Sequence, residues 1–140
     1  MKILVYVDAS MHSLHAVETA AKIAKDVHAS VTILAIGLRY TSGKSYTDKL
    51  EEESTIALRK AEDIMKKGAV SPRTMLLRDV TLLNAKDEIV DIIKEDGFDL
   101  VIIGSMALTG LKKLMFGGID VALVDAVPCS VLAVRTPLED

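Results

Sequence analysis

The sequence predicts an α/β fold: a single open five-stranded parallel sheet, in the order 3-2-1-4-5, with helices on both faces. Short apolar runs alternate with segments whose apolar residues recur at three- and four-residue spacing. Such alternation is typical of parallel strands joined by helical crossovers. Half of the residues are hydrophobic but only 4% are aromatic, which suits strands buried on both faces. The 140 residues have the usual size of one domain, so we expect residues 1–140 to form one.

The first strand and helix are predicted from the opening residues. Lys2–Val7 is an apolar run that ends at Asp8, and either Ser10 or Ser13 is expected to cap the helix that follows. Ser30–Gly37 is predicted as the second buried strand. The helix between the two strands is indicated by apolar residues at helical spacing, namely Leu14, Val17, Ala21, Ala24 and Val27.

A loop and a long helix are predicted next. Leu38–Ser45 contains glycine and hydroxyl residues and is expected to be a loop. An amphipathic helix is expected from Thr47 to about Lys67, ended by Gly68. The acidic run Glu51–Glu53 near its start suits the helix dipole and is interpreted as a solvated face.

The second half of the chain repeats the alternation. Asn84 is expected to cap a helix that Gly97 ends. The remaining predicted elements are a third strand at Arg73–Val80, a fourth at Asp99–Ile103, a helix at Ile119–Ala126 and a fifth strand at Cys129–Val134.

Charge and cysteine content exclude several classes of function. The formal net charge is −3, and without a basic stripe a nucleic-acid partner is not expected. Cys129 is the single cysteine, so an intramolecular disulfide is impossible and a reducing compartment is expected. No apolar stretch approaches the ~20 residues of a membrane span, and the N-terminus does not resemble a signal peptide. The expected location is therefore the cytoplasm.

Open parallel sheets bind ligands beyond the carboxyl ends of their strands, where the strand order reverses. If the ends of strands one and four form one such site, these strands are neighbours, which gives the predicted order 3-2-1-4-5. Asp8 follows the first strand directly, and Gly104 opens a loop that runs to Gly117 and Gly118 before the last helix. Glycines at a helix N-terminus let phosphate oxygens reach backbone N–H groups, and Asp8 can accept hydrogen bonds from ribose hydroxyls. Two simpler interpretations stay open: the glycines serve only as turn residues, and Asp8 serves only as a helix cap.

Three stretches together resemble the universal stress protein family. They are Ile3–Ser10, the segment from Gly104 to Asp120, and Val127–Arg135. The resemblance extends over the whole chain and implies a Rossmann-like fold of the nucleotide-binding α-hydrolase type. It also implies a small stress-response protein. One branch of that family binds adenine nucleotides, so the cofactor that the resemblance implies is ATP or AMP with Mg²⁺.

The phosphate signature of that branch resembles glycine, two residues, glycine, nine residues, then glycine and a hydroxyl residue. Three positions depart from it: Ala107 replaces the second glycine, Gly118 replaces the hydroxyl residue, and Asp120 replaces a further hydroxyl. A carboxylate about 4 Å from a phosphate costs about 4 kcal/mol at an effective dielectric of about 20, unless a divalent cation bridges the two. Carried over in full, the nucleotide-binding residues are Asp8, Ile36 (packing on adenine), Gly104, Ala107, Gly117, Gly118, Ile119 and Asp120.

Other reactive side chains are interpreted as structural. His12 and His15 lie three residues apart, but no further metal ligand is evident, so no metal site is expected. Cys129 is expected to be an inert thiol, since no adjacent base can be placed. No catalytic residues are assigned.

The apolar last strand is expected at the edge of the sheet, where a bare edge invites pairing with another chain. The resemblance implies a homodimer in which two such strands pair antiparallel; the alternative is that Thr136–Asp140 shields the edge. The residues assigned to the dimer contact are Val131, Leu132, Ala133 and Val134.

Three functions stay open for this sequence: a nucleotide-responsive binding module, a dimeric stress protein that acts through protein contacts without nucleotide, and a slow nucleotide hydrolase.

Overall fold

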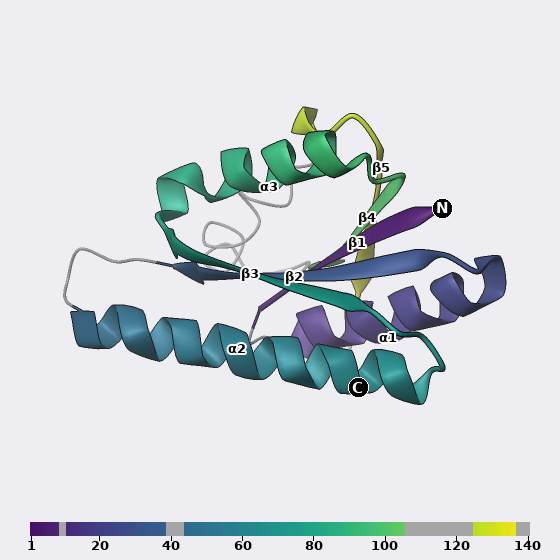
Figure 1. Cartoon of the computed structure of the whole chain (residues 1–140), viewed down its shortest axis with the longest axis horizontal. Coiled ribbons are helices and arrows are strands. Elements are labelled where there is room, and N and C mark those ends of the chain that lie inside the picture. Colours follow the sequence, from purple (N-terminus) through teal and green to yellow (C-terminus); the bar gives the residue numbers. More distant parts are fainter. Residues whose placement is uncertain (9–10, 39–43, 106–124, 137–140) are drawn as a thin grey trace.

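Five parallel strands form one sheet in the order β3-β2-β1-β4-β5 (Figure 1). The computed structural model describes residues 1–8, 11–38, 44–105 and 125–136. The predicted order 3-2-1-4-5 is confirmed, and it reverses between β1 and β4. The strands are β1 (Lys2–Val7), β2 (Ser30–Leu38), β3 (Arg73–Val80), β4 (Leu100–Ser105) and β5 (Ser130–Arg135).

Three strands are displaced slightly from their predicted bounds. β4 and β5 pair from Leu100↔Ser130 to Ser105↔Arg135, so both run past the apolar residues. A ladder uses backbone groups and therefore continues through Gly104 and Ser105. Asp99 lies before β4, where its N–H donates to the Lys2 carbonyl at 2.8 Å and its carboxylate accepts from the Lys2 N–H at 2.8 Å.

Three helices connect the strands: α1 (Met11–Val27), α2 (Lys44–Lys67) and α3 (Leu82–Asp96). α2 begins three residues before the predicted Thr47, and Leu38 belongs to β2. The rest of the predicted loop, residues 39–43, lies outside the described ranges. Of the predicted helix Ile119–Ala126, only Asp125 and Ala126 are described, and both are helical. None of the helices within the described ranges is both long enough and apolar enough to span a membrane.

The caps of α3 correct one prediction. Thr81, not Asn84, is the N-cap: its hydroxyl oxygen accepts from the Asn84 N–H at 3.3 Å. Thr81 has extended backbone angles, and Asn84 already lies in the first helical turn. Gly97 ends α3 as predicted, in the left-handed conformation (φ +69°), and its N–H donates to the Ile93 carbonyl.

Gly68 follows α2 directly, but the left-handed residue there is Ala69 (φ +62°). A Cβ on Gly68 would lie 3.2 Å from the Cβ of Ala21. The glycine thus lets the end of α2 approach α1, while the chain reversal falls on the next residue.

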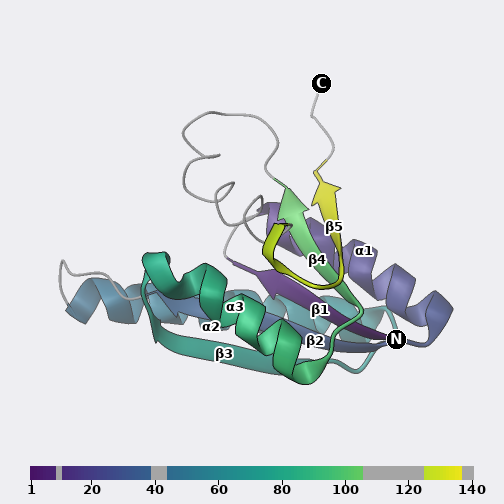
Figure 2. The same ribbon diagram turned by 90° about the horizontal axis from the view of Figure 1, so that it is seen from above.

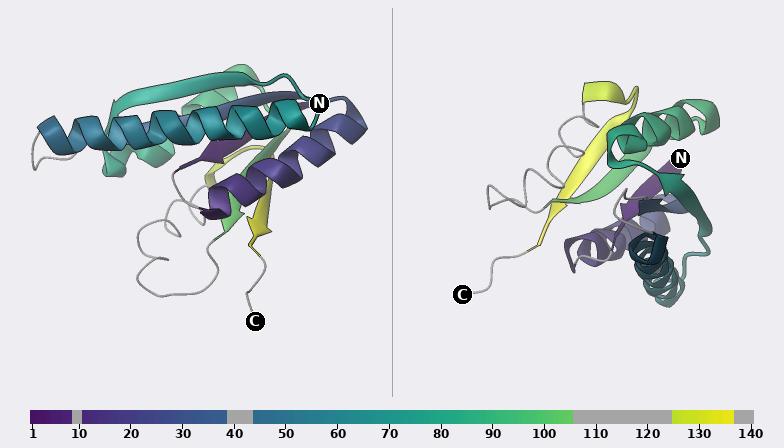
Figure 3. Two further views of the ribbon diagram at one scale, coloured as in Figure 1. Left: turned by 90° about the horizontal axis from the view of Figure 1, so that it is seen from below. Right: turned by 90° about the vertical axis from the view of Figure 1, so that its left-hand side faces the viewer.

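Two hydrophobic layers cover the sheet, one on each face (Figures 1 and 3). In β1, Ile3, Val5 and Val7 pack toward α1 and α2, whereas Leu4 packs toward α3. This alternation follows from the two-residue period of a strand. The predicted cover of helices on both faces is confirmed. The α3 layer contains Leu4, Leu34, Ile36, Val80, Ala85, Ile89, Val90, Ile93, Phe98, Val101 and Ile103.

Candidate functional site

The carboxyl ends of β1 and β4 lie side by side at the point where the strand order reverses (Figure 2). The register pairs Ile3 with Leu100 and Val5 with Ile102. Asp8 follows β1 directly, and Gly104 is the penultimate residue of β4. The two strand ends chosen from the sequence are therefore neighbours, as an open parallel sheet requires of a ligand site.

The first turn of α1 fixes the position of Asp8. The Asp8 backbone N–H donates to the Ser13 hydroxyl oxygen at 2.8 Å, and Ser13 is only 4% exposed. Ser13 is the third residue of the helix, so it does not cap α1 as expected; it holds the preceding strand end instead. The alternative cap, Ser10, lies outside the described residues.

Gly104 contacts the backbone of the same helical turn. A Cβ at this position would lie 2.5 Å from the His12 carbonyl oxygen and 2.8 Å from the Ser13 nitrogen. Real Cβ atoms do not approach other atoms so closely, so any side chain would push α1 away from β4. The glycine is thus required by helix packing, whatever ligand binds nearby.

The two histidines of α1 have separate partners. His12 Nδ1 lies 2.7 Å from the Thr136 hydroxyl oxygen, which connects α1 to the end of β5. His15 Nδ1 lies 3.6 Å from a Glu18 carboxylate oxygen. Within the described ranges no three His, Cys, Asp or Glu side chains are grouped so that they could hold a metal ion.

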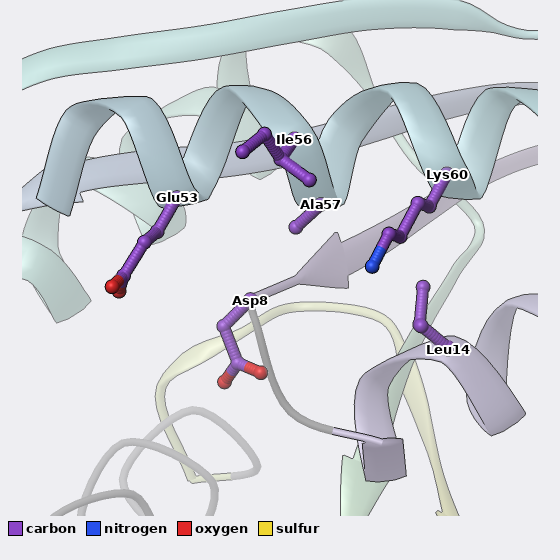
Figure 4. A pocket seen from close by; sticks show the side chains of 6 residues that line it. All are labelled: Asp8, Leu14, Glu53, Ile56, Ala57 and Lys60. Atoms are coloured by element: carbon purple, nitrogen blue, oxygen red, sulfur yellow. The ribbon is translucent and has the colours of Figure 1, made fainter. Parts of the chain in front are cut away.

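A pocket of about 100 Å³ opens beside Asp8, between α1 and α2 (Figure 4). Its apolar surface comes from Leu14, Ile56 and Ala57, and its charged groups are those of Asp8, Glu53 and Lys60. None of the α2 residues was predicted from the sequence to belong to a site. Their spacing of three, four and seven residues from Glu53 places them on one face of a helix, and that spacing was the available signal.

The acidic run Glu51–Glu53 lies beyond the first turn of α2, because the helix begins at Lys44. It therefore does not complement the helix dipole as expected, and it is not a uniformly solvated face either. Glu51 pairs with Arg78 on β3, with 3.2 Å between Arg78 Nε and the carboxylate oxygen. Glu53 lines the pocket, and of the three acids only Glu52 is exposed. The helical twist sends successive side chains in different directions, so a run of three acids cannot share one environment.

Besides Asp8 and Gly104, Ile36 is the only predicted nucleotide residue within the described ranges. Ile36 is 5% exposed and packs in the α3 layer; its carbonyl accepts from the Ser54 hydroxyl at 2.8 Å. It does not line the pocket. The other five residues lie outside the described ranges: Ala107, Gly117, Gly118, Ile119 and Asp120.

Cys129 lies just before β5 and is half-buried. Burial raises the pKa of its thiol, and the negative charge of Asp99 raises that pKa further. The thiol form therefore dominates at neutral pH, and a thiol is a poor nucleophile compared with a thiolate. This environment fits the inert cysteine expected from the sequence.

Comparison with known proteins shows the family. Residues 1–135 match the universal stress protein family. The chain belongs to that family. A universal stress protein of Methanocaldococcus jannaschii is 28% identical to it over 147 aligned positions, which cover 99% of this chain and 84% of the relative. The resemblance noted in the sequence is confirmed.

Solved structures of universal stress proteins share the fold. That of Lactobacillus plantarum has a TM-score of 0.79 at 22% identity, with 96% of this chain and 97% of that one covered. The protein of Archaeoglobus fulgidus, solved in complex with dAMP, has a TM-score of 0.73 at 21% identity and covers 95% and 96% of the two chains. Further structures of this fold contain cAMP or AMP.

Proposed function

We propose that this universal stress protein is a nucleotide-responsive binding module that holds an adenine nucleotide, ATP or AMP, beyond the carboxyl ends of β1 and β4. The observation that carries the proposal is that Asp8 and Gly104 flank the same turn of α1 and that Asp8 borders a pocket. Relatives of the same fold that contain dAMP, cAMP or AMP support it.

The roles proposed for individual residues follow the family signature. Asp8 accepts hydrogen bonds from the ribose, and the backbone N–H groups of Gly117, Gly118 and Ile119 bind phosphate oxygens. Asp120 repels phosphate unless Mg²⁺ bridges the two charges. Gly104 and Ala107 begin the phosphate segment, and Ile36 is assigned to the adenine ring. Its burial against α3 means that any contact with adenine falls at the edge of its side chain.

We infer that the protein binds rather than converts its nucleotide. Phosphoryl transfer requires a group that positions and deprotonates the attacking nucleophile beside the phosphates, and no residue of this chain is assigned that role. Residues 1–140 are proposed to act as one domain in the cytoplasm.

We also propose a homodimer formed by antiparallel pairing of β5. Within the described ranges this strand pairs only with β4, and its Val131 and Leu132 are only partly buried. An edge with partly exposed apolar residues is suited to pairing with a second copy. Light scattering of the purified protein is expected to give twice the mass of the chain.

Calorimetric titration with AMP, ADP and ATP, each with and without Mg²⁺, tests the proposed function. We expect saturable binding of at least one nucleotide with a dissociation constant in the micromolar range, and tighter ATP binding when Mg²⁺ offsets Asp120. Binding of ATP that is equal with and without Mg²⁺ would remove the role given to the cation. If no adenine nucleotide bound at millimolar concentration, the proposal would be wrong, and a family member that acts through protein contacts would be the better description.

A further inference from the structure

One face of α2 forms a wall of the pocket beside Asp8. Glu53, Ile56, Ala57 and Lys60 make up this face, and we name them the α2 wall. In Figure 4 the Glu53 carboxylate and the Lys60 ammonium extend from α2 on either side of Ile56 and Ala57, toward the level of Asp8. An apolar strip thus lies between a hydrogen-bond acceptor and a hydrogen-bond donor.

The α2 wall has charged groups without an ion-pair partner among the described residues, and an apolar side chain that is exposed. None of the ion pairs formed within the described ranges uses Glu53 or Lys60. Ile56 is 44% exposed, although it is a large apolar residue. A ligand with an apolar ring face and polar groups at its rim would satisfy both features, because such pockets combine apolar contact with a few placed hydrogen bonds.

Size and charge limit which part of a nucleotide fits here. The pocket holds about 100 Å³, whereas sites that enclose a whole drug-sized ligand hold roughly 300–1,000 Å³. Two carboxylates, on Asp8 and Glu53, face one ammonium group on Lys60, so the negative charge is in excess. A phosphate is repelled by that excess, whereas the hydroxyl groups of an uncharged sugar can donate to both carboxylates.

We propose that the α2 wall is a ribose-recognition wall, in which Glu53 accepts from and Lys60 donates to the hydroxyl pair of the ribose, opposite Asp8. The phosphates then lie away from α2, on the side of β4. The inference rests on the proposed function and adds two specificity-determining residues to it. Contacts from the α2 wall to the ribose make the protein selective for ribonucleotides over nucleotides that lack both the 2′- and the 3′-hydroxyl.

The test compares ATP with 2′,3′-dideoxy-ATP in the wild type and in Glu53→Gln. Hydrogen bonds to charged groups are strong enough that their loss weakens binding about tenfold or more. We expect Glu53→Gln to weaken ATP binding about tenfold and to leave dideoxy-ATP binding within about twofold. Lys60→Met is expected to show the same pattern. Glu52→Gln is the matched control, because Glu52 is exposed on the adjoining face of α2 and does not line the pocket.

The outcomes separate this inference from the proposed function. A wild type that binds ATP, with Glu53→Gln and Lys60→Met that bind it equally well, would overturn the ribose wall and leave nucleotide binding intact. Equal weakening of ATP and dideoxy-ATP would also overturn it, since the affected contact would not involve the hydroxyls. A wild type that binds neither ligand would overturn the proposed function, and the ribose wall with it.

Discussion

Gly104→Ala is expected to destabilise the fold by about 3 kcal/mol, the upper part of the usual range for an overpacked site. The added Cβ would lie 2.5 Å from the His12 carbonyl oxygen and 2.6 Å from the His12 carbonyl carbon. Both atoms belong to backbone, so no side-chain rotation relieves the clash. The first turn of α1 must move away from β4, and it carries with it the Ser13 hydroxyl that holds Asp8.

Urea unfolding of Gly104→Ala and Gly97→Ala measures this steric effect against a matched control. Gly97 has a left-handed φ of +69°, but a Cβ there would meet nothing within 4 Å. Its substitution is expected to cost about 1 kcal/mol, from backbone strain alone. Equal losses in the two variants, measured without nucleotide, would show that Gly104 is not needed for the packing of α1 on β4.

Ile89→Ala is expected to destabilise the fold by about 3 to 4 kcal/mol. Ile89 is fully buried in the layer between α3 and the sheet, among side chains of β1, β2 and β4. Removing a buried side chain of this size forfeits its transfer free energy and leaves a cavity that the surrounding strands cannot fill.

Leu83→Ala provides the control for Ile89→Ala within the same helix. Leu83 is 90% exposed, so its truncation is expected to change the free energy of unfolding by no more than about 0.5 kcal/mol. Thermal or urea unfolding measures both variants. If Ile89→Ala unfolded at the same urea concentration as the wild type, the assignment of Ile89 to the core of the α3 layer would be wrong.

The two helix layers could be predicted because they depend on periodicity and on the rules of parallel crossovers. The strand order followed from a further assumption, that Asp8 and Gly104 belong to one site, because strands one and four must then be neighbours. The caps were harder. Thr81 and Asn84 are both good N-cap residues, and only the backbone angles at Thr81 decide between them. Gly68 is likewise the residue expected to end α2 in the left-handed conformation. Its lack of a side chain instead lets α2 pack closely against Ala21, and Ala69 takes the left-handed conformation.

Only part of the candidate site could be found from the sequence. The end of an apolar run marks both Asp8 and Gly104, so both could be named from the sequence, and the structure places their two strand ends side by side. The sequence could not say that the atom approaching Gly104 belongs to His12, because that contact joins residues far apart in the chain. Glu53 and Lys60 could not be predicted, because charged residues on a helix usually face solvent. Only the three-dimensional structure shows that this face of α2 lies beside Asp8 at the end of β1.

Binding of an adenine nucleotide at the carboxyl edge of the sheet can be followed residue by residue through the backbone amide resonances of labelled protein during titration with AMP. We expect saturable shifts at Asp8, Gly104 and Ile56, which border the pocket or the adjoining strand end. Ala29 and Gly97, which lie before β2 and before β4 at the opposite edge, should not shift. Shifts centred on Ala29 and Gly97, or none at any residue at saturating AMP, would contradict that expectation.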